Sequence, residues 1–321
     1  MELSNVIIDI DGLSLTQEEM EMVKHPSVAG VILFTRNYDN KAQLRELTRH
    51  LQQIKPNLII AVDQEGGRIQ RFVNGFTSLP NMQHWGDLYQ EDSQRAVEGL
   101  QQMTRTMVLE LQQVGVNLSI APVLDINHGM NDVIGNRSFS SSHELVTRLG
   151  KVLIQTMKSF GMTTVAKHFP GHGGVKEDSH FELPVDQRDF ETIWNTDMQP
   201  FIHLAADYDA VMPAHIIFSS VKKELVSYSR YWLVDVLREK LNFRGAIMSD
   251  DLTMNAATHI GDYDDRTIAA IDAGCDILIA CNNRSGAIKV LETSARVTRG
   301  AHNPYLDHYL SKFAVPVLSP A

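Results

Sequence analysis

The chain has 321 residues, of which 43% are hydrophobic and 21% charged, a composition typical of a soluble protein with a large buried core. Its formal net charge of −10 argues against a surface that follows nucleic-acid phosphates. No apolar run approaches the ~18 residues that a membrane span requires, so we expect neither nucleic acid nor membrane as a partner.

The N-terminal segment is acidic and lacks the basic region of a signal peptide, so we expect a cytoplasmic protein. The two cysteines, Cys275 and Cys281, lie in or next to an apolar strand pattern. We expect both to be reduced core residues, and not a disulfide or a metal clip.

Short apolar runs typical of strands alternate with segments of helical period along the chain. Strands are predicted at residues 6–10, 30–34, 58–63, 116–122, 163–169, 210–215, 246–250 and 276–280. Helices are predicted at residues 16–24, 40–54, 92–114, 145–160, 189–206, 229–241, 262–272 and 284–298.

Strict alternation of strands and helices predicts parallel strands joined by helical crossovers, and eight such units close into a barrel. A doubly wound sheet is disfavoured because no G-x-G-x-x-G follows the first strand. No linker marks a second domain. The sequence therefore predicts the α/β class and a single (β/α)8 TIM barrel domain over residues 1–321.

The longest connections, residues 64–91, 123–140 and 170–188, follow the third, fourth and fifth strands. In a barrel they lie on the C-terminal face, where the active site is built. Polar residues gather at the strand ends of that face, and their mixture suits a ligand covered in hydroxyl groups: Asp63, Glu65, Arg68, Arg71, Asp125, Arg137, Lys167, His168, His215, Ser249, Asp250, Asp251 and Asn282.

Among these residues, Asp250 is the best candidate for covalent chemistry. It ends the apolar run A-I-M-S-D, which can hold its carboxylate rigidly. Because side chains alternate along a strand, Asp250 and Asp251 cannot both face the barrel centre unless the strand has ended. We expect Asp251 to cap the helix or turn that follows. A single fixed carboxylate suits attack on an anomeric carbon or stabilisation of an oxocarbenium ion.

The loop that begins at Pro170 is rich in proton-carrying side chains, and its three glycines would let it bend or move. Asp178 and His180 are two residues apart, so an extended loop places them on one side. The carboxylate would fix the imidazole tautomer, and the ring could donate and take back a proton. Glu177 and Glu182 remain rival donors, because a carboxylic acid is the commoner donor in glycosidases.

A metal site is a further interpretation of this region, because His168, His172, Asp178 and His180 resemble a ligand set. Pro170 prevents the helix that would align the first two histidines. The remaining spacing matches no zinc pattern. We therefore expect no metal and no cofactor.

Several long motifs point to one family. The segments K-H-F-P-G-H-G from Lys167 and D-S-H-F-E-L-P from Asp178 resemble the signature of the glycoside hydrolase family 3 β-N-acetylhexosaminidases. The likeness runs nearly end to end and is closest to the compact single-domain bacterial enzymes of peptidoglycan recycling. Further matching segments are V-D-Q-E-G-G-R-I-Q-R-F from Val62, G-N-R-S-F from Gly135, M-P-A-H from Met212, S-D-D-L-T-M from Ser249 and A-G-C-D-I-L-I-A-C-N-N from Ala273.

This resemblance implies a glycosidase on a TIM barrel. The implied reaction is retaining exo-β-N-acetylglucosaminidase activity that removes terminal β-linked N-acetylglucosamine (GlcNAc) from GlcNAc-1,6-anhydro-N-acetylmuramic acid, with or without its peptide. The resemblance assigns Asp250 as nucleophile, His180 as acid/base in preference to Glu182, and Asp178 as the partner of His180. It assigns sugar binding to Asp63, Arg71, Arg137, Lys167 and His168. We expect a monomer that acts on a small-molecule sugar.

Three alternatives stay open at the level of sequence. A phosphorylase would use phosphate in place of water to break the same glycosyl–Asp250 intermediate. A non-catalytic barrel would only bind sugar. In a substrate-assisted mechanism, the acetamido oxygen would attack in place of Asp250.

Overall fold

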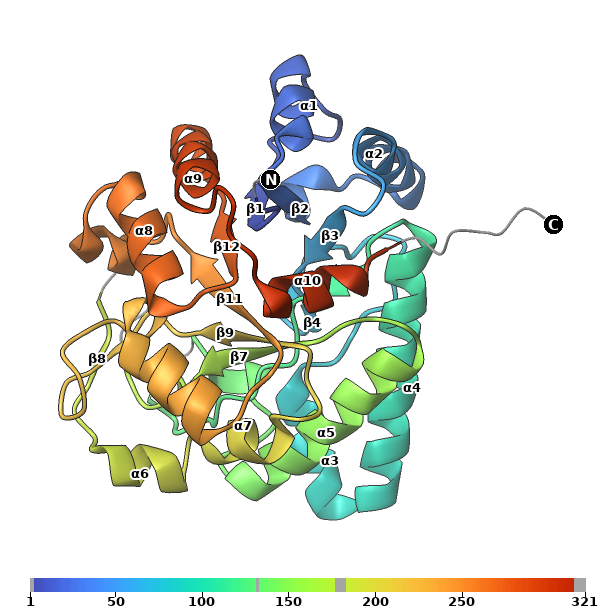
Figure 1. Cartoon of the computed structure of the whole chain (residues 1–321). Coiled ribbons are helices and arrows are strands. Elements are labelled where there is room, and N and C mark those ends of the chain that lie inside the picture. The colour runs from blue at the N-terminus through green and yellow to red at the C-terminus, as the bar shows by residue number, and fades with distance from the viewer. Residues whose placement is uncertain (1–2, 131–132, 177–182, 315–321) are drawn as a thin grey trace.

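The computed structural model describes residues 3–130, 133–176 and 183–314. Its main sheet has eight parallel strands in the order β6-β3-β2-β1-β12-β11-β9-β7. Two parallel bridges, Leu118–Thr163 and Val123–Lys167, join the segments of the outer strands β6 and β7, so the sheet closes into a barrel (Figure 1). The predicted barrel is confirmed. The strands are β1 (Val6–Asp9), β2 (Val28–Leu33), β3 (Ile59–Val62), β6 (Leu118–Ser119), β7 (Val165–Phe169), β9 (Ala210–Pro213), β11 (Ala246–Asp251) and β12 (Ile277–Ala280).

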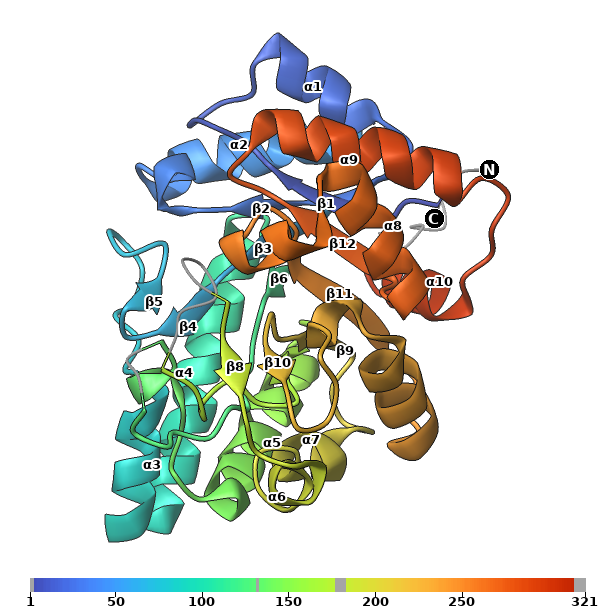
Figure 2. The ribbon, with the colours of Figure 1, turned by 90° about the vertical axis from the view of Figure 1, so that its left-hand side faces the viewer.

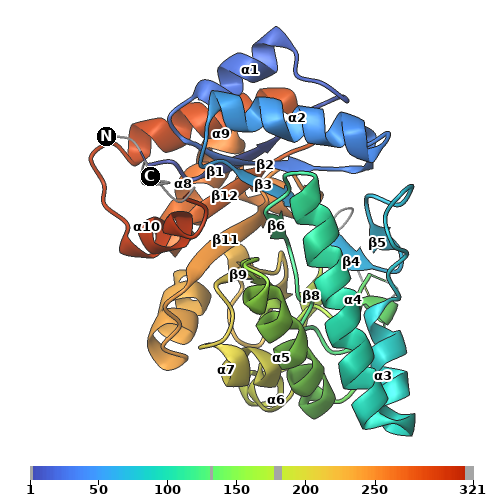
Figure 3. The ribbon, with the colours of Figure 1, turned by 90° about the vertical axis from the view of Figure 1, so that its right-hand side faces the viewer.

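Helices surround the barrel on the outside (Figures 2 and 3). They are α1 (Gln17–Lys24), α2 (Lys41–Ile54), α3 (Met82–Glu91), α4 (Ser93–Gln113), α5 (His143–Ser159), α6 (Phe190–Asn195), α7 (Gln199–Leu204), the π-type helix η4 (Tyr231–Lys240), α8 (Tyr263–Ala273), α9 (Arg284–Val297) and α10 (Pro304–Ser311). Short 3-10 turns are η1 (Thr35–Asn37), η2 (Gly135–Arg137), η3 (Val226–Tyr228) and η5 (Asn255–Ile260). Two small sheets pair β4 (Gln64–Gly66) with β5 (Ile69–Gln70), and β8 (Val185–Asp186) with β10 (Ile217–Phe218).

The strands are buried on both faces, which explains their continuous apolar sequences. In β1, Ile7 points into the barrel, while its neighbours Val6 and Ile8 belong to the larger core beneath the helices. Helix α10 adds Leu306 and Tyr309 to the inner core, where they cover the N-terminal opening of the barrel (Figure 1). The opposite, C-terminal opening therefore remains for a ligand.

Sequence patterns missed some elements. The predicted helix 189–206 is wrong, because the structure breaks it into α6 and α7. Pro200 lies at the start of α7, and the side chain of Asp197 in the break is bound by Arg188 and His128. Helix α3 was predicted as part of a long connection, although Asn81 caps it by accepting the N–H of His84. Helix α10 was not predicted.

Two sequence expectations on composition can be compared with the structure directly. Cys275 and Cys281 are buried free thiols, as predicted. In the described part of the chain, no helix is long and apolar enough to cross a membrane.

Candidate active site

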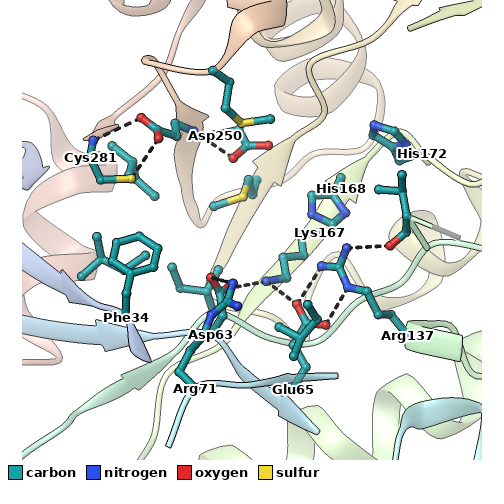
Figure 4. A pocket seen from close by; sticks show the side chains of 18 of the residues that line it. Phe34, Asp63, Glu65, Arg71, Arg137, Lys167, His168, His172, Asp250 and Cys281 are labelled. Carbon is teal, nitrogen blue, oxygen red and sulfur yellow. Dashed lines mark hydrogen bonds and ion pairs between the residues drawn. The ribbon is translucent and has the colours of Figure 1, made fainter. Parts of the chain in front are cut away.

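A cavity of about 160 Å³ opens at the C-terminal ends of the strands (Figure 4). Most of the polar residues singled out in the sequence line it, although they come from segments that are far apart along the chain. Its polar and sulfur-containing lining consists of Asp63, Glu65, Arg71, Arg137, Lys167, His168, His172, Met212, Asp250, Asp251, Met254, Cys281 and Asn282. Parallel strands that all end at one edge explain why distant segments meet here.

Lys167 in β7 lies at the centre of one wall. Its Nζ is 2.8 Å from Asp63 Oδ1 and 2.7 Å from Glu65 Oε1, and its side chain is 3% exposed. Burial alone would lower the pKa of Lys167, but the charges of Asp63 and Glu65 raise it above its ordinary value. The ammonium is therefore charged, and it is fixed between two carboxylates.

The same pattern of alternating charges continues on both sides. Two guanidinium nitrogens of Arg137, in η2, donate to the two oxygens of Glu65 at 2.8 Å each. At the other end, Arg71 Nη2 is 3.7 Å from Asp63 Oδ2. Burial alone would raise the pKa of Glu65, but Arg137 and Lys167 lower it far below its ordinary value. We call the series Arg71–Asp63–Lys167–Glu65–Arg137 the ion chain (Figure 4).

The ion chain holds polar groups in place before a ligand arrives. Its cations are donors and its carboxylates are acceptors, which is the complement that vicinal sugar hydroxyls need. Arg71 Nε is buried and has no hydrogen-bond partner among the described residues. Glu65 was noted in the sequence without a role, although it stands in the same V-D-Q-E-G-G-R segment as Asp63 and Arg71.

Two histidines lie beside the ion chain. His168 Nδ1 is 2.7 Å from Oδ2 of the fully buried Asp125. The ring of His172 is buried, and in the described part of the chain both of its nitrogens lack a partner. Burial, and then the neighbouring His168, lower the pKa of His172, which favours its neutral imidazole. The sequence suggested His172 only as a possible metal ligand.

Asp250 lines the cavity at the end of β11, across from the ion chain (Figure 4). Its Oδ1 accepts the N–H of Asp251 at 2.8 Å. The carboxylate of Asp251 is used differently, because it accepts from Thr253 N at 2.9 Å and from Cys281 Sγ at 2.9 Å. Its predicted capping role is confirmed for the turn at Thr253, and both Asp250 and Asp251 line the cavity.

Four of the polar residues expected at the rim do not line this cavity, and one of them, Asp125, lies behind the cavity wall against His168. His215 is fully buried, with Nδ1 against Ser227 Oγ and Nε2 3.1 Å from Asp251 O. Ser249 Oγ accepts the N–H of Ile279 at 3.0 Å, because alternation along β11 turns it away from the side that Asp250 faces. Arg68 is exposed and donates to a backbone carbonyl. The prediction that these side chains face the ligand was wrong.

The predicted acid/base residues Asp178 and His180, with the rivals Glu177 and Glu182, lie outside the described residues. At the start of their loop the glycines permit close packing. A Cβ at Gly173 would lie 1.8 Å from Ile126 O, and one at Gly171, where φ is +137°, would lie 2.6 Å from Asp197 Cβ. Gly173 is therefore required by contact, and Gly171 by contact and by its positive φ.

A metal centre was considered for the histidines of this region. Over residues 3–130, 133–176 and 183–314, no three His, Cys, Asp or Glu side chains come together in a way that could hold a metal ion.

The chain is similar to known proteins over most of its length. The family model described as "Glycosyl hydrolase family 3 N terminal domain" matches residues 2–303. Proteins named beta-hexosaminidase from Hydrogenovibrio crunogenus and Haemophilus influenzae are 45% and 46% identical over 293 residues, which cover 91% and 90% of this chain and 82% and 83% of theirs.

Among solved structures, NagZ from Neisseria gonorrhoeae in complex with N-trifluoroacetyl-D-glucosamine superposes with a TM-score of 0.90 at 37% identity, covering 98% of this chain and 90% of that chain. A family 3 beta-N-acetylglucosaminidase from Paenibacillus gives 0.88 at 30% identity, covering 97% of this chain and 60% of that chain. The chain therefore belongs to glycosyl hydrolase family 3 and is a glycoside hydrolase of the beta-hexosaminidase type.

Proposed function

We propose that the protein is a retaining exo-β-N-acetylglucosaminidase that removes terminal β-linked GlcNAc from GlcNAc-1,6-anhydro-N-acetylmuramic acid, with or without its peptide, in cell-wall recycling. The observation that carries the proposal is the position of Asp250 across one cavity from the ion chain. A rigid carboxylate on one side and fixed polar groups on the other suit a sugar ring held between them.

In this proposal the wall opposite Asp250 binds the GlcNAc ring. Asp63, Arg71, Arg137, Lys167 and His168 would form hydrogen bonds to its hydroxyls. Their prior pairing means that little reorganisation is needed when the sugar enters. The Neisseria gonorrhoeae relative in complex with N-trifluoroacetyl-D-glucosamine, an N-acylated glucosamine, supports the sugar type.

The reaction would proceed in two displacements. A carboxylate oxygen of Asp250 forms a bond to C1 while the bond from C1 to the leaving oxygen breaks, and His180 gives its proton to that oxygen. His180 then takes a proton from water, whose oxygen bonds to C1 as the bond to Asp250 breaks. Asp178 would orient His180 and stabilise its charged form. The roles of Asp178 and His180 rest on the sequence, because both lie outside the described residues.

Trapping with an N-acylated glucosamine derivative that carries fluorine at C5 tests whether Asp250 is the nucleophile. We expect mass spectrometry to find the sugar on the peptide that contains Asp250, and Asp250→Asn protein to remain unlabelled. An unlabelled wild-type enzyme that still turns over would favour attack by the acetamido oxygen.

Assays with and without phosphate, with analysis for sugar 1-phosphate, separate hydrolysis from phosphorolysis. Hydrolysis of a chromogenic N-acetylglucosaminide excludes a non-catalytic barrel.

The variant His180→Ala tests the proton donor. General acid catalysis contributes about 10²- to 10⁴-fold, and it matters most when the leaving group is poor. We therefore expect the loss to be large on the natural disaccharide and smaller on activated aryl glycosides. If both substrates are cleaved at the wild-type rate, His180 is not the acid. Glu177→Gln and Glu182→Gln are the matched variants for the rival donors.

The remaining expectations belong to the same proposal. They are a monomer without cofactor, a single catalytic domain over residues 1–321, and a cytoplasmic location. Two buried free thiols fit a reducing compartment. Sedimentation of the purified protein and fractionation of cells measure the oligomeric state and the location.

A further inference from the structure

The carboxylate of Asp125 lies behind the cavity wall. Its segment runs alongside β7, where Leu124 N donates to Lys167 O at 2.7 Å and Lys167 N donates to Pro122 O at 3.0 Å. This pairing fixes the position of Asp125 relative to the ion chain. The Asp125 side chain is fully buried. Because a buried carboxylate needs hydrogen bonds to be tolerated, its partners indicate its role.

The hydrogen-bond partners of this carboxylate come from two neighbouring histidines. His168 Nδ1 is 2.7 Å from Oδ2, and the His168 backbone N–H is 3.2 Å from each oxygen. The backbone N–H of His172 donates to Oδ1 at 2.7 Å. Burial alone would raise the pKa of the Asp125 carboxyl, but His168 and then His172 lower it below its ordinary value. An ionised carboxylate only accepts, so the proton lies on Nδ1 of His168.

We propose that Asp125 is a positioning residue, whose carboxylate fixes the His168 imidazole with Nδ1 protonated and Nε2 directed to the sugar. The proposal rests on the proposed function, in which His168 contacts the sugar. Asp125 itself does not line the cavity, whereas His168 does. His168 Nε2 has no hydrogen-bond partner among the residues the structure describes, so it is left for a ligand hydroxyl. The tautomer of a histidine is set by the partner of its other nitrogen.

Asp125 also contacts the turn that carries Arg137, a second side chain proposed to bind the sugar. The hydroxyl of Ser138 donates to the backbone carbonyl of Asp125 at 2.7 Å. Ser138 directly follows η2, which carries Arg137. Asp125 therefore connects the turn of Arg137 with His168 in β7 and with His172 in the loop that follows, so all three are placed relative to one buried segment.

Asp125→Asn is the primary test. The amide offers one acceptor oxygen to three N–H donors and places its own NH2 group against one of them. We expect kcat/KM on a chromogenic N-acetyl-β-glucosaminide to fall about 10- to 100-fold, as for other lost partners of functional histidines. In a double-mutant cycle with His168→Gln, the double variant should be close to His168→Gln alone, because Asp125 acts through that ring.

Asp209→Asn is the matched control. Asp209 is also a buried aspartate that accepts backbone and side-chain hydrogen bonds, but it lies at the start of β9, at the opposite end of the barrel. We expect this variant to lower the thermal unfolding midpoint while kcat/KM stays close to that of the wild type. A loss that reflected only weaker folding would appear equally in both variants.

A spectroscopic measurement on the unmodified protein avoids any loss of folding. In protein labelled with ¹⁵N-histidine, the His168 signal, assigned by its absence in His168→Gln, should show a proton on Nδ1. Adding N-acetylglucosamine should shift Nε2 more than Nδ1. A ring with Nδ1 unprotonated, or an Asp125→Asn effect of equal size with and without His168, would overturn the proposal. Absence of any hydrolysis by wild-type protein would instead contradict the proposed function and leave the tautomer result intact.

Discussion

The two ends of the barrel both contain buried carboxylates, and they use them differently. At the N-terminal end, Asp209 and Asp276 directly precede β9 and β12. Asp276 accepts from Ile247 N at 2.6 Å, from Asn303 Nδ2 at 2.8 Å, and from Arg238. These bonds join a strand to the segments that close the barrel. At the C-terminal end, Asp63 and Asp250 follow or end their strands and line a cavity.

The two ends of the barrel also differ in where buried Arg and His nitrogens without a hydrogen-bond partner lie. In the described part of the chain, the buried Arg and His nitrogens without a hydrogen bond belong to Arg71 and His172, and both residues line the cavity. An unsatisfied buried donor costs about 1–3 kcal/mol. Among the described residues, buried hydroxyls without a partner also occur toward the N-terminal end, at Ser27, Thr163 and Tyr309. What distinguishes the C-terminal end is that its unpaired Arg and His nitrogens line a cavity that can receive a ligand. Function and stability are thus assigned to opposite ends of the same strands, as is general for this fold.

Asp250→Asn compared with Asp276→Asn should give the largest contrast. Loss of the nucleophile should lower kcat at least ~10⁴-fold with little change in unfolding temperature. Asp276→Asn should lower the unfolding temperature and leave kcat of the folded protein near that of the wild type. Steady-state kinetics and thermal unfolding of both variants measure this. Comparable activity losses in the two variants would contradict the claim that the C-terminal end serves catalysis and the N-terminal end serves stability.

Lys167→Met and Arg238→Met test the same difference between the two ends with cations. Lys167 pairs with Asp63 and Glu65 at the C-terminal end, and Arg238 pairs with Asp276 at the N-terminal end. Breaking a buried ion pair costs about 3–5 kcal/mol, so denaturant unfolding should show a similar loss of stability for both. Only Lys167→Met should also reduce kcat/KM, since only Lys167 lines the cavity. The assays are made at temperatures where both variants are folded. If Arg238→Met lowers kcat/KM as much as Lys167→Met does, the loss of activity does not depend on the position of Lys167 in the cavity.

The smallest expected effect is on the pH dependence of stability. Burial lowers the pKa of His172 below its ordinary value of 6.5, so the unfolded chain binds a proton that the folded protein resists. The stability contributed by the neutral ring is present above pH 6.5 and is lost as the pH falls below it. His172→Gln should therefore give a shallower decline than wild type in denaturant unfolding between pH 7 and 5. His259→Gln, at an exposed histidine, is the control, and an unchanged slope for His172→Gln would contradict the prediction.

Most of the site could be predicted because its residues stand at the ends of apolar strands. Asp63, Lys167 and Asp250 follow this rule, and all three line the cavity. His215 and Ser249 follow the same rule in sequence and yet are turned into hydrogen bonds within the protein. Strand position alone does not give side-chain direction once a strand ends or its register shifts, as it does between Met248 and Asp251.

The sequence by itself determined the alternation of strands and helices, the barrel and the family, because hydrophobic period and long motifs are local properties. Only the tertiary structure decided the pairings: that Glu65 joins Lys167 to Arg137, and that Asp125 holds His168. Partners separated by 43 to 104 residues meet only when the barrel closes, as between Asp125 and His168 or Asp63 and Lys167. Closure of the barrel is not encoded in any short sequence pattern. It is therefore the step that brings the charged strand ends together into one site.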